Sequence, residues 1–263
     1  MSKVDLDKLV AFVDSKIAEF HSSKLDAIKC LELNHLLKRK NPYLFKAKNI
    51  TTVEIYVRYL LDAYLSSQEE TMFGTFLEGL SIYVCGLAFG GQKAPAEGID
   101  LDFSRDGKRY LVSVKSGPDW GNSSQVTKMK DDFRKAKRII GQDVVCVNGC
   151  CYGRGEKENK GDYIKKCGQS FWEFISGKPE FYKEIVEPLG HKAKERNDEF
   201  NKEYGKVVNK FGESFSTCYL NKDKSINWAK IVEFNSSLKP PPKTNRLKSK
   251  PQRETSTGTS KKH

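Results

Sequence analysis

The sequence predicts an α/β or α+β protein in which a mixed central sheet is flanked by helices and preceded by an N-terminal helical region. Apolar residues recur at helical spacing through much of residues 4–88. Between residues 98 and 115 the period changes to two, which is typical of strands. Helical spacing then returns, with one more apolar strand within it, so strands and helices mix in the second half of the chain.

The expected elements follow from where these periods begin and end. A first helix carries Leu9, Val13 and Ile17 on one face, and Pro42 should stop helical continuation after a second helix. The helices expected before the sheet cover residues 4–20, 24–38, from 51 or 52 to about 66, and 71–88. Beyond the hairpin we expect a basic helix over 124–138, a strand over 143–148, and helices over 163–174, 179–185 and 191–210.

Composition divides the chain into three parts and suggests an anionic partner. Residues 1–68 form the N-terminal helical region, residues 69–237 the core with its C-terminal helices, and residues 238–263 a basic tail that we expect to be disordered. The formal net charge is +12, but the tail holds eight basic residues against one acid, Glu254, which leaves an excess of five on the rest. Nucleic acid is therefore a plausible partner that charge alone does not establish.

The N-terminal sequence, the lengths of the apolar runs and the use of cysteine indicate a cytoplasmic protein. The N-terminus shows no secretory signal, and no apolar run approaches the roughly 18 residues that span a bilayer. Seven cysteines without a signal are typical of reduced thiols. The cluster formed by Cys146, Cys150, Cys151 and Cys167 lacks the paired C-x2-C spacing of structural zinc sites. Buried or incidental thiols are favoured over zinc.

The Asp106-Gly107 dipeptide is a favoured two-residue turn and predicts a β-hairpin from residue 98 to residue 115. Pairing the strands outward from this turn places opposed residues on one face. The expected pairs are Arg105 with Lys108, Asp102 with Leu111, Asp100 with Ser113, and Gly98 with Lys115. The other face would carry Ile99, Leu101, Phe103, Val112 and Val114. Two carboxylates, a hydroxyl and a lysine should therefore project together.

Two carboxylates beside a lysine suit phosphodiester hydrolysis. A hard cation such as Mg²⁺ prefers carboxylate oxygens, can offset the charge of a phosphate and can lower the pKa of a bound water. A nearby ammonium can orient that water and stabilise the transition state. The alternative is a solvated strand face on which acids and a lysine form ordinary cross-strand pairs.

Asp100, followed by the strand Ser113-Val114-Lys115, resembles the PD-(D/E)XK nuclease motif. Across residues 36–195 the stretches LKRKNPYLFKAKN, FGTFLEGLS, GIDLDF, VSVKSGPDWGNSSQ and CGQSFWEFISG are similar to type II restriction endonucleases of the PmeII-like group. The resemblance implies a restriction-endonuclease-like sheet and Mg²⁺-dependent, sequence-specific cleavage of double-stranded DNA in restriction-modification defence. It also implies a cognate DNA methyltransferase as a genetic partner and, because restriction sites are usually palindromic, a two-fold homodimer.

The resemblance assigns roles to individual residues. Asp100 matches the metal-binding aspartate and Lys115 the catalytic lysine, but Ser113 stands where the motif usually has an acid. The missing carboxylate must then come from elsewhere. Glu78, in Gly74-Thr-Phe-Leu-Glu78, resembles a helix glutamate found in many members of the superfamily, although an exposed helix acid is the alternative. Asp102 is a second candidate ligand, and Glu97 would qualify only if the strand bulges.

Three segments are candidates for contact with DNA. Hydroxyl and amide side chains follow the catalytic strand and can bind phosphates or base edges, unless the segment is a structural turn that Trp120 caps. These candidates are Ser116, Trp120, Asn122, Ser123, Ser124 and Gln125. Lys128 begins a run of basic residues on the next helix, which could be a phosphate track or a solvated face balanced by Asp131 and Asp132. Lys40 and Lys46 lie in a basic, aromatic segment over 38–48.

Two other functions compete with restriction. A nuclease of the same fold could act in repair or junction resolution. A non-catalytic DNA-binding protein on a decayed nuclease fold is suggested by Ser113, and it would bind DNA without magnesium and without nicking it. His191 could act as a general base, but a cap or surface role is favoured for it.

Overall fold

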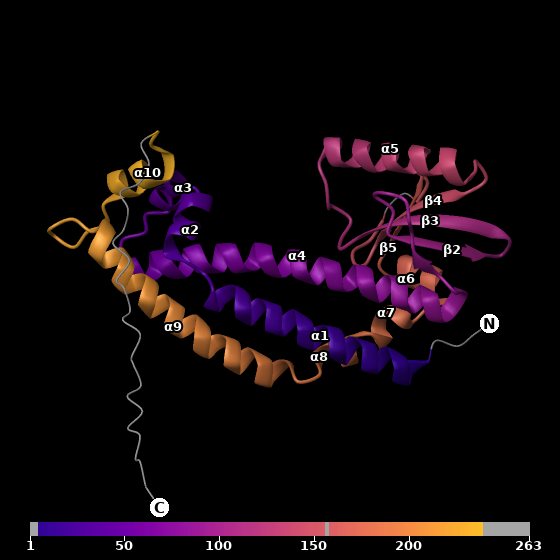
Figure 1. The fold of residues 1–263 in the computed structure, drawn as a ribbon, viewed down its shortest axis with the longest axis horizontal. Coiled ribbons are helices and arrows are strands. Elements are labelled where there is room, and N and C mark those ends of the chain that lie inside the picture. The colour runs from indigo at the N-terminus through magenta and orange to yellow at the C-terminus, as the bar shows by residue number, and fades with distance from the viewer. Residues whose placement is uncertain (1–4, 156–157, 239–263) are drawn as a thin grey trace, which may run out of the picture.

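A five-stranded mixed sheet lies at one end of the protein, and long helices extend from it to a helical end (Figure 1). The computed structural model describes residues 5–155 and 158–238. Within them the sheet has the order β1-β2-β3-β4-β5, in which β1 to β3 pair antiparallel and β3 to β5 pair parallel. The strands are β1 (Gln92–Lys93), β2 (Leu101–Arg105), β3 (Lys108–Lys115), β4 (Val145–Cys150) and β5 (Ile164–Cys167). The predicted mixed sheet flanked by helices is confirmed.

The predicted hairpin forms between β2 and β3. Asp106 and Gly107 both adopt positive φ, at 51° and 74°, as a type I′ turn requires. Arg105 pairs with Lys108 and Asp102 with Leu111, as expected from the turn.

The outer end of the hairpin departs from the prediction. Ladder pairing stops at Leu101, so the expected pairs Asp100–Ser113 and Gly98–Lys115 do not form. Gly98 has a φ of 76°, and the Asp100 N–H donates to the carbonyl of Val112 (2.9 Å). This bulge-like shift turns Ile99 away from Leu101 and into the core on the opposite face, where Leu111 lies.

Each face of the sheet is covered by helices. One face, with Leu101, Phe103, Val112 and Val114, packs against α4 (Val53–Phe89) and α6 (Gln169–Ser176), and α1 (Leu6–Lys29) joins the same core by packing on α4. The other face packs against α5 (Ser123–Ile140) through Met129, Phe133 and Ala136. Figure 1 shows α5 alone on its side of the sheet. Burial of both faces explains why β3 and β4 carry near-continuous apolar runs.

The segment predicted as a helix over 163–174 divides into two elements. Its first part is β5, which pairs parallel with β4, and α6 begins only at Gln169. Gly168 adopts a φ of 51° between them and donates its N–H to the Cys150 carbonyl (2.9 Å). A four-residue strand at the sheet edge is too short to show a period of its own, and its pairing depends on β4.

One continuous helix, α4, links the sheet to the helical end. It begins at Val53, close to the expected start at 51 or 52, and Thr52 caps it by accepting the N–H of Ile55 (3.4 Å). The two helices expected over 51–66 and 71–88 are a single helix of 37 residues, roughly 55 Å long, because residues 67–70 carry no helix-breaking residue. α4 runs unbroken through residues 68 and 69, so the division between the first two domains stays a prediction.

By length and composition, α4 could cross a membrane, and it is the sole such helix among the described residues. This corrects the expectation that no apolar run approaches the roughly 18 residues that span a bilayer. The buried residues of α4, from Tyr56 to Cys85, enter the helical core at one end and the sheet core at the other. They therefore pack as those of a core helix do.

The helical end surrounds the first half of α4. Its core joins residues of α2 (Leu33–Arg39), α3 (Pro42–Ala47), α9 (Ala193–Tyr219) and α10 (Trp228–Ser236). Two short helices, α7 (Phe181–Glu184) and α8 (Val186–Gly190), precede α9. The predicted tail falls outside the described residues beyond Leu238.

Helix boundaries at this end correct several predictions. α1 continues through residues 21–23 to Lys29, where two helices over 4–20 and 24–38 were expected, because no Gly or Pro interrupts it there. Pro42 follows the end of α2, but it also begins α3, where its fixed φ suits the first turn and Asn41 caps the N–H groups of Tyr43 and Leu44. α10 was not predicted.

Candidate active site

Asp100 lies in the irregular segment before β2, and its side chain takes the place of a ladder partner. Asp100 Oδ2 accepts the backbone N–H of Val114 at 2.7 Å. The side chain is 16% exposed, so it faces the surface while the backbone of β3 holds it in place. The bulge that moves Ile99 to the other face thus lets this carboxylate meet the end of β3.

Lys115 ends β3 beside that carboxylate. Its Nζ lies 3.9 Å from Asp100 Oδ2, and its side chain is 29% exposed. The structure therefore brings the side chains of Asp100 and Lys115 together. A direct cross-strand pair does not produce this meeting, because the ladder ends at Leu101.

Glu78 and Lys93 complete the charged cluster. Glu78 projects from α4 and forms an ion pair with Lys93 of β1. Burial raises the pKa of Asp100 above its ordinary value, whereas the Val114 N–H and the Lys115 ammonium oppose that rise. The Glu78 carboxylate adds to the rise in the Asp100 pKa and the Lys93 ammonium opposes it, so the other three charges of the cluster all act on Asp100.

Sequence analysis missed Lys93. It lies in a two-residue strand that pairs Gln92 with Asp102 and Lys93 with Leu101. Two residues are too few to show a strand period, and the contact with Glu78 joins residues 15 positions apart. A lysine shortly after a helix-ending Gly90-Gly91 pair carried no signal that singled it out.

Asp102 has a different environment from Asp100. It is 5% exposed, and Arg109 grips both of its oxygens, with Nε at 2.9 Å from Oδ1 and Nη2 at 2.6 Å from Oδ2. A bidentate guanidinium satisfies a carboxylate and holds its geometry. Glu97 is 86% exposed and pairs with Lys128. Of the three candidate acids for the missing ligand, Glu78 is the one whose charge acts on Asp100.

The donor set suits a magnesium ion. Among the described residues no group of three or more His, Cys, Asp or Glu side chains gathers to hold a metal. Asp100 and Glu78 offer two carboxylates, and Mg²⁺ is commonly bound by one or two carboxylates with water and substrate phosphate completing its shell. Like-charge repulsion between these two acids is also what a divalent cation relieves.

The residues after β3 are largely held by the protein itself. Asn122 and Gln125 form a capping box at the start of α5, with each side chain bonded to the other's backbone N–H at 3.1 and 3.0 Å. Ser123 and Ser124 are exposed in the first turn of α5, and Ser116 is half-buried. The sequence N-S-S-Q carried this capping signal, which sequence analysis assigned to DNA contact.

The remaining basic candidates make contacts of their own within the protein. Lys128 pairs with Asp132 at 3.0 Å and with Glu97 at 3.6 Å. Lys40 donates to the carbonyl of Ala63 at 2.6 Å, and Lys46 lies over the Trp228 ring. Figure 1 places α2 and α3, which flank and contain these two lysines, at the opposite end of α4 from the sheet.

A groove of about 860 Å³ runs between α4 and the segment that follows β3. Lys115 lines it together with Ser116, Trp120 and Tyr152, and α4 contributes Glu69 and Glu70. A neighbouring hollow of about 1060 Å³ shares Phe73, Leu77, Tyr152 and Gly153 with it. Lys115 is thus the member of the charged cluster that reaches a surface depression.

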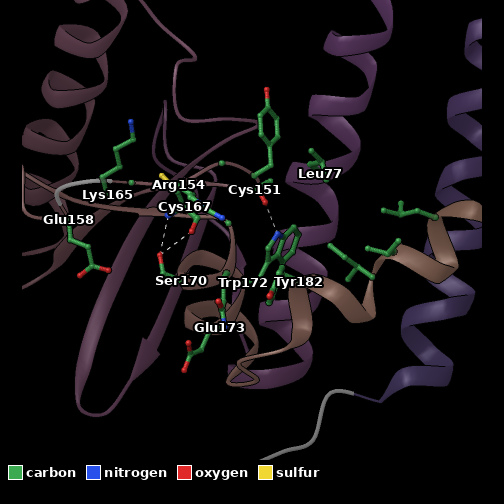
Figure 2. Close-up of a pocket in the computed structure, with 18 of the residues that line it drawn as sticks. Leu77, Cys151, Arg154, Glu158, Lys165, Cys167, Ser170, Trp172, Glu173 and Tyr182 are labelled. Carbon is green, nitrogen blue, oxygen red and sulfur yellow. Dashed lines mark hydrogen bonds between the residues drawn. The ribbon is translucent and has the colours of Figure 1, made fainter.

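Figure 2 shows residues that line the neighbouring hollow. Trp172 is one of them and donates from Nε1 to the Cys151 carbonyl at 2.7 Å (Figure 2). Cys146, Cys150, Cys151 and Cys167 are buried, and burial raises the pKa of the Cys151 thiol to about 12. Thiols with raised pKa values are poor nucleophiles and poor ligands.

His191 does not join the candidate site. Its Nδ1 lies 2.8 Å from Asp14 Oδ1, so the contact links the segment between α8 and α9 to α1. This contact is of the surface kind that the sequence favoured.

The sheet, its covering helices and the charged cluster define the class of the protein as a restriction-endonuclease-like α+β fold. The family model described as type II restriction endonuclease EcoO109I matches residues 7–197, which is most of the chain. The chain belongs to this family of restriction endonucleases. A comparison with curated proteins finds no match.

Proposed function

We propose that this protein is a type II site-specific deoxyribonuclease that hydrolyses phosphodiester bonds of double-stranded DNA with Mg²⁺, in restriction-modification defence. In finer terms, we propose a PD-(D/E)XK site of the PmeII-like kind. The observation that carries the proposal is the meeting of Asp100 and Lys115 at 3.9 Å, beside Glu78, in a chain of a restriction endonuclease family.

The proposed ligands are Asp100 and Glu78. A bound Mg²⁺ would supply Lewis acidity and a water of lowered pKa. Asp100 suits a ligand because the Val114 N–H fixes one of its oxygens and leaves the other oxygen for a cation. Glu78 takes the part that Ser113 cannot, since Ser113 is 1% exposed and carries no charge.

Lys115 is proposed to act on the reacting groups from the groove side. Its ammonium can donate to an attacking water and to the developing negative charge on the phosphate. Lys93 would leave Glu78 when a cation binds, because the ammonium and a cation compete for the same oxygens. In this proposal Asp102, paired with Arg109, has a structural role in the sheet.

The wider setting is proposed from the family. The exposed start of α5, with Ser123, Ser124 and Lys128, is the proposed track for DNA phosphates. A two-fold homodimer would match a palindromic site, a DNA methyltransferase would protect the host, and the cytoplasm would be the compartment.

Digestion of unmethylated phage DNA tests the proposal. With Mg²⁺ the wild-type protein should produce discrete bands, and EDTA should abolish them. Asp100→Ala, Lys115→Ala and Glu78→Gln should each leave the DNA intact. Glu54→Gln is the matched control, because Glu54 is a 69% exposed acid at the far end of the same helix.

Each other outcome favours a different function. A smear would indicate a nonspecific nuclease. Intact DNA with wild-type protein, together with magnesium-independent binding, would favour the non-catalytic DNA-binding protein that Ser113 suggests. Cutting by Asp100→Ala at the wild-type rate would show that the chemistry lies elsewhere.

A further inference from the structure

A buried amide connects the two central strands behind Lys115. Asn148 of β4 is 1% exposed and is the cross-strand partner of Ser113. Its Nδ2 donates to the Ser113 carbonyl at 3.3 Å, and its Oδ1 accepts the Nε1–H of Trp120 at 3.1 Å. A buried amide in such contacts holds its partner in one orientation, because breaking the bond to the Ser113 carbonyl leaves a buried N–H unpaired, and breaking the bond to Trp120 leaves Oδ1 with only the weak Cys150 S–H donor at 3.8 Å.

Trp120 presents its ring face to Lys115. The Lys115 Nζ lies 5.2 Å from the centre of the Trp120 ring, on the same side chain whose ammonium lies 3.9 Å from Asp100. A tryptophan face attracts an ammonium within about 6 Å of its centre. Lys115 is therefore held between a carboxylate and a ring face.

The segment that carries Trp120 is itself anchored. The Ser116 carbonyl accepts the N–H of Tyr152 at 3.0 Å, and the Pro118 carbonyl accepts from Lys165 Nζ at 2.8 Å. A Cβ on Gly117 would lie 2.4 Å from the Tyr152 ring, so the ring is packed against the bare backbone. The segment is therefore fixed from β3 onward and does not depend on DNA for its placement.

We propose that Trp120 is a positioning residue for Lys115, and that Asn148 sets the orientation of the indole. The side chain of Lys115 is a flexible four-carbon stem, and contact with the ring face restricts its ammonium to positions near Asp100. This inference rests on the proposed function and replaces the expectation that Trp120 contacts DNA. Misplacing a catalytic group by about 1 Å can lower a rate by about 100-fold.

Single-turnover cleavage separates positioning from DNA contact. Trp120→Leu should lower the rate at saturating protein by about 10-fold to 100-fold, while its Kd for DNA, measured with Ca²⁺ in place of Mg²⁺, stays within about twofold of wild type. Trp120→Phe keeps a smaller ring face and loses the Nε1–H bond to Asn148, so its rate should lie between those of the wild type and Trp120→Leu. A weaker Kd with an unchanged rate would overturn the proposal.

A spectroscopic measurement tests the contact without cleavage. The chain has three tryptophans, so 5-fluorotryptophan labelling should give three ¹⁹F signals, and Trp120→Phe assigns the one of interest. Lys115→Met should shift that signal. Lys46→Met is the matched control, because Lys46 lies 5.7 Å from the Trp228 ring and should shift only the Trp228 signal.

The two tests also separate this inference from the proposed function. If wild-type protein fails to cut DNA, the proposed function fails, and the ¹⁹F experiment still decides whether the indole senses Lys115. If wild-type protein cuts and Trp120→Leu cuts equally fast, the positioning role is wrong. An unchanged Trp120 signal in Lys115→Met would overturn it as well.

Discussion

Replacing Asp100 with Asn should stabilise the metal-free protein while abolishing cleavage. Burial raises the pKa of Asp100, so holding this carboxylate ionised in the folded chain costs free energy at neutral pH. Asn keeps an oxygen that can accept the Val114 N–H and removes the charge. The rise in the Asp100 pKa remains after the attraction to Lys115 has opposed it, so losing that attraction does not reverse the sign.

The direction of the effect follows from the raised pKa of Asp100. For its size we expect a net stabilisation of about 1 kcal/mol, the order of a typical single substitution, or roughly 2–4 °C in Tm for a chain of this length. The folded pKa lies above the unfolded value of about 3.9. The cost therefore is absent in acid, grows as the pH rises between the two pKa values, and is complete above the folded one.

Thermal unfolding followed by circular dichroism measures this. In EDTA near pH 8 the variant should melt above the wild type, and the difference should shrink as the pH falls toward about 4. Adding Mg²⁺ at ten times its Kd should stabilise the wild type by about 1.4 kcal/mol and leave the variant unchanged. A variant that melts lower in EDTA at neutral pH would refute the cost assigned to the buried charge. A variant that keeps the Mg²⁺ response would refute the placement of the metal at Asp100.

Three further substitutions test neighbouring parts of the account. Lys93→Met should tighten Mn²⁺ binding by about twofold to fivefold in a calorimetric titration, because no ammonium then competes with the metal for the carboxylate of Glu78. Weaker binding would contradict this. Arg109→Met should lower the free energy of unfolding in urea by about 1–2 kcal/mol, because it leaves the 5% exposed carboxylate of Asp102 without its ion-pair partner. The loss stays in this range because water can reach the half-exposed position of Arg109. The Mg²⁺-induced rise in Tm of this variant should match that of the wild type, and a larger rise would indicate that Asp102, freed from Arg109, binds the metal. Gly98→Ala should cost about 2 kcal/mol or more in urea unfolding, because the φ is 76° and the new Cβ would lie 2.3 Å from Asp132 Oδ2; an unchanged midpoint would show that the turn at Gly98 relaxes freely.

Local signals explain what could be predicted from the sequence. The Asp106-Gly107 turn specifies its own hairpin, and Thr52 caps α4, because both contacts join residues close in the chain. Glu78 was singled out by a resemblance on α4, and the structure places its charge close enough to act on Asp100. The spacing alone left Glu78 and Asp102 as alternatives.

Long-range contacts explain what could not be predicted. β5 was taken for a helix because its identity depends on pairing with β4, about 17 residues earlier in the ladder. The meeting of Asp100 and Lys115 arises from a bulge, whereas the sequence predicted a regular ladder. The contacts of Lys93 and Asn148 depend on how α4, β1, β3 and β4 pack together. Neither residue lies in a sequence motif, so the sequence did not indicate them.

Anomalous diffraction from crystals grown with Mn²⁺ would test the central claim most directly. We expect one strong peak between the carboxylates of Glu78 and Asp100, within about 2.0–2.5 Å of an oxygen of each, with the Lys115 ammonium beside it and the Lys93 ammonium displaced. A peak at Asp102, or an active protein whose crystals show no manganese at the Glu78–Asp100 pair, would contradict it.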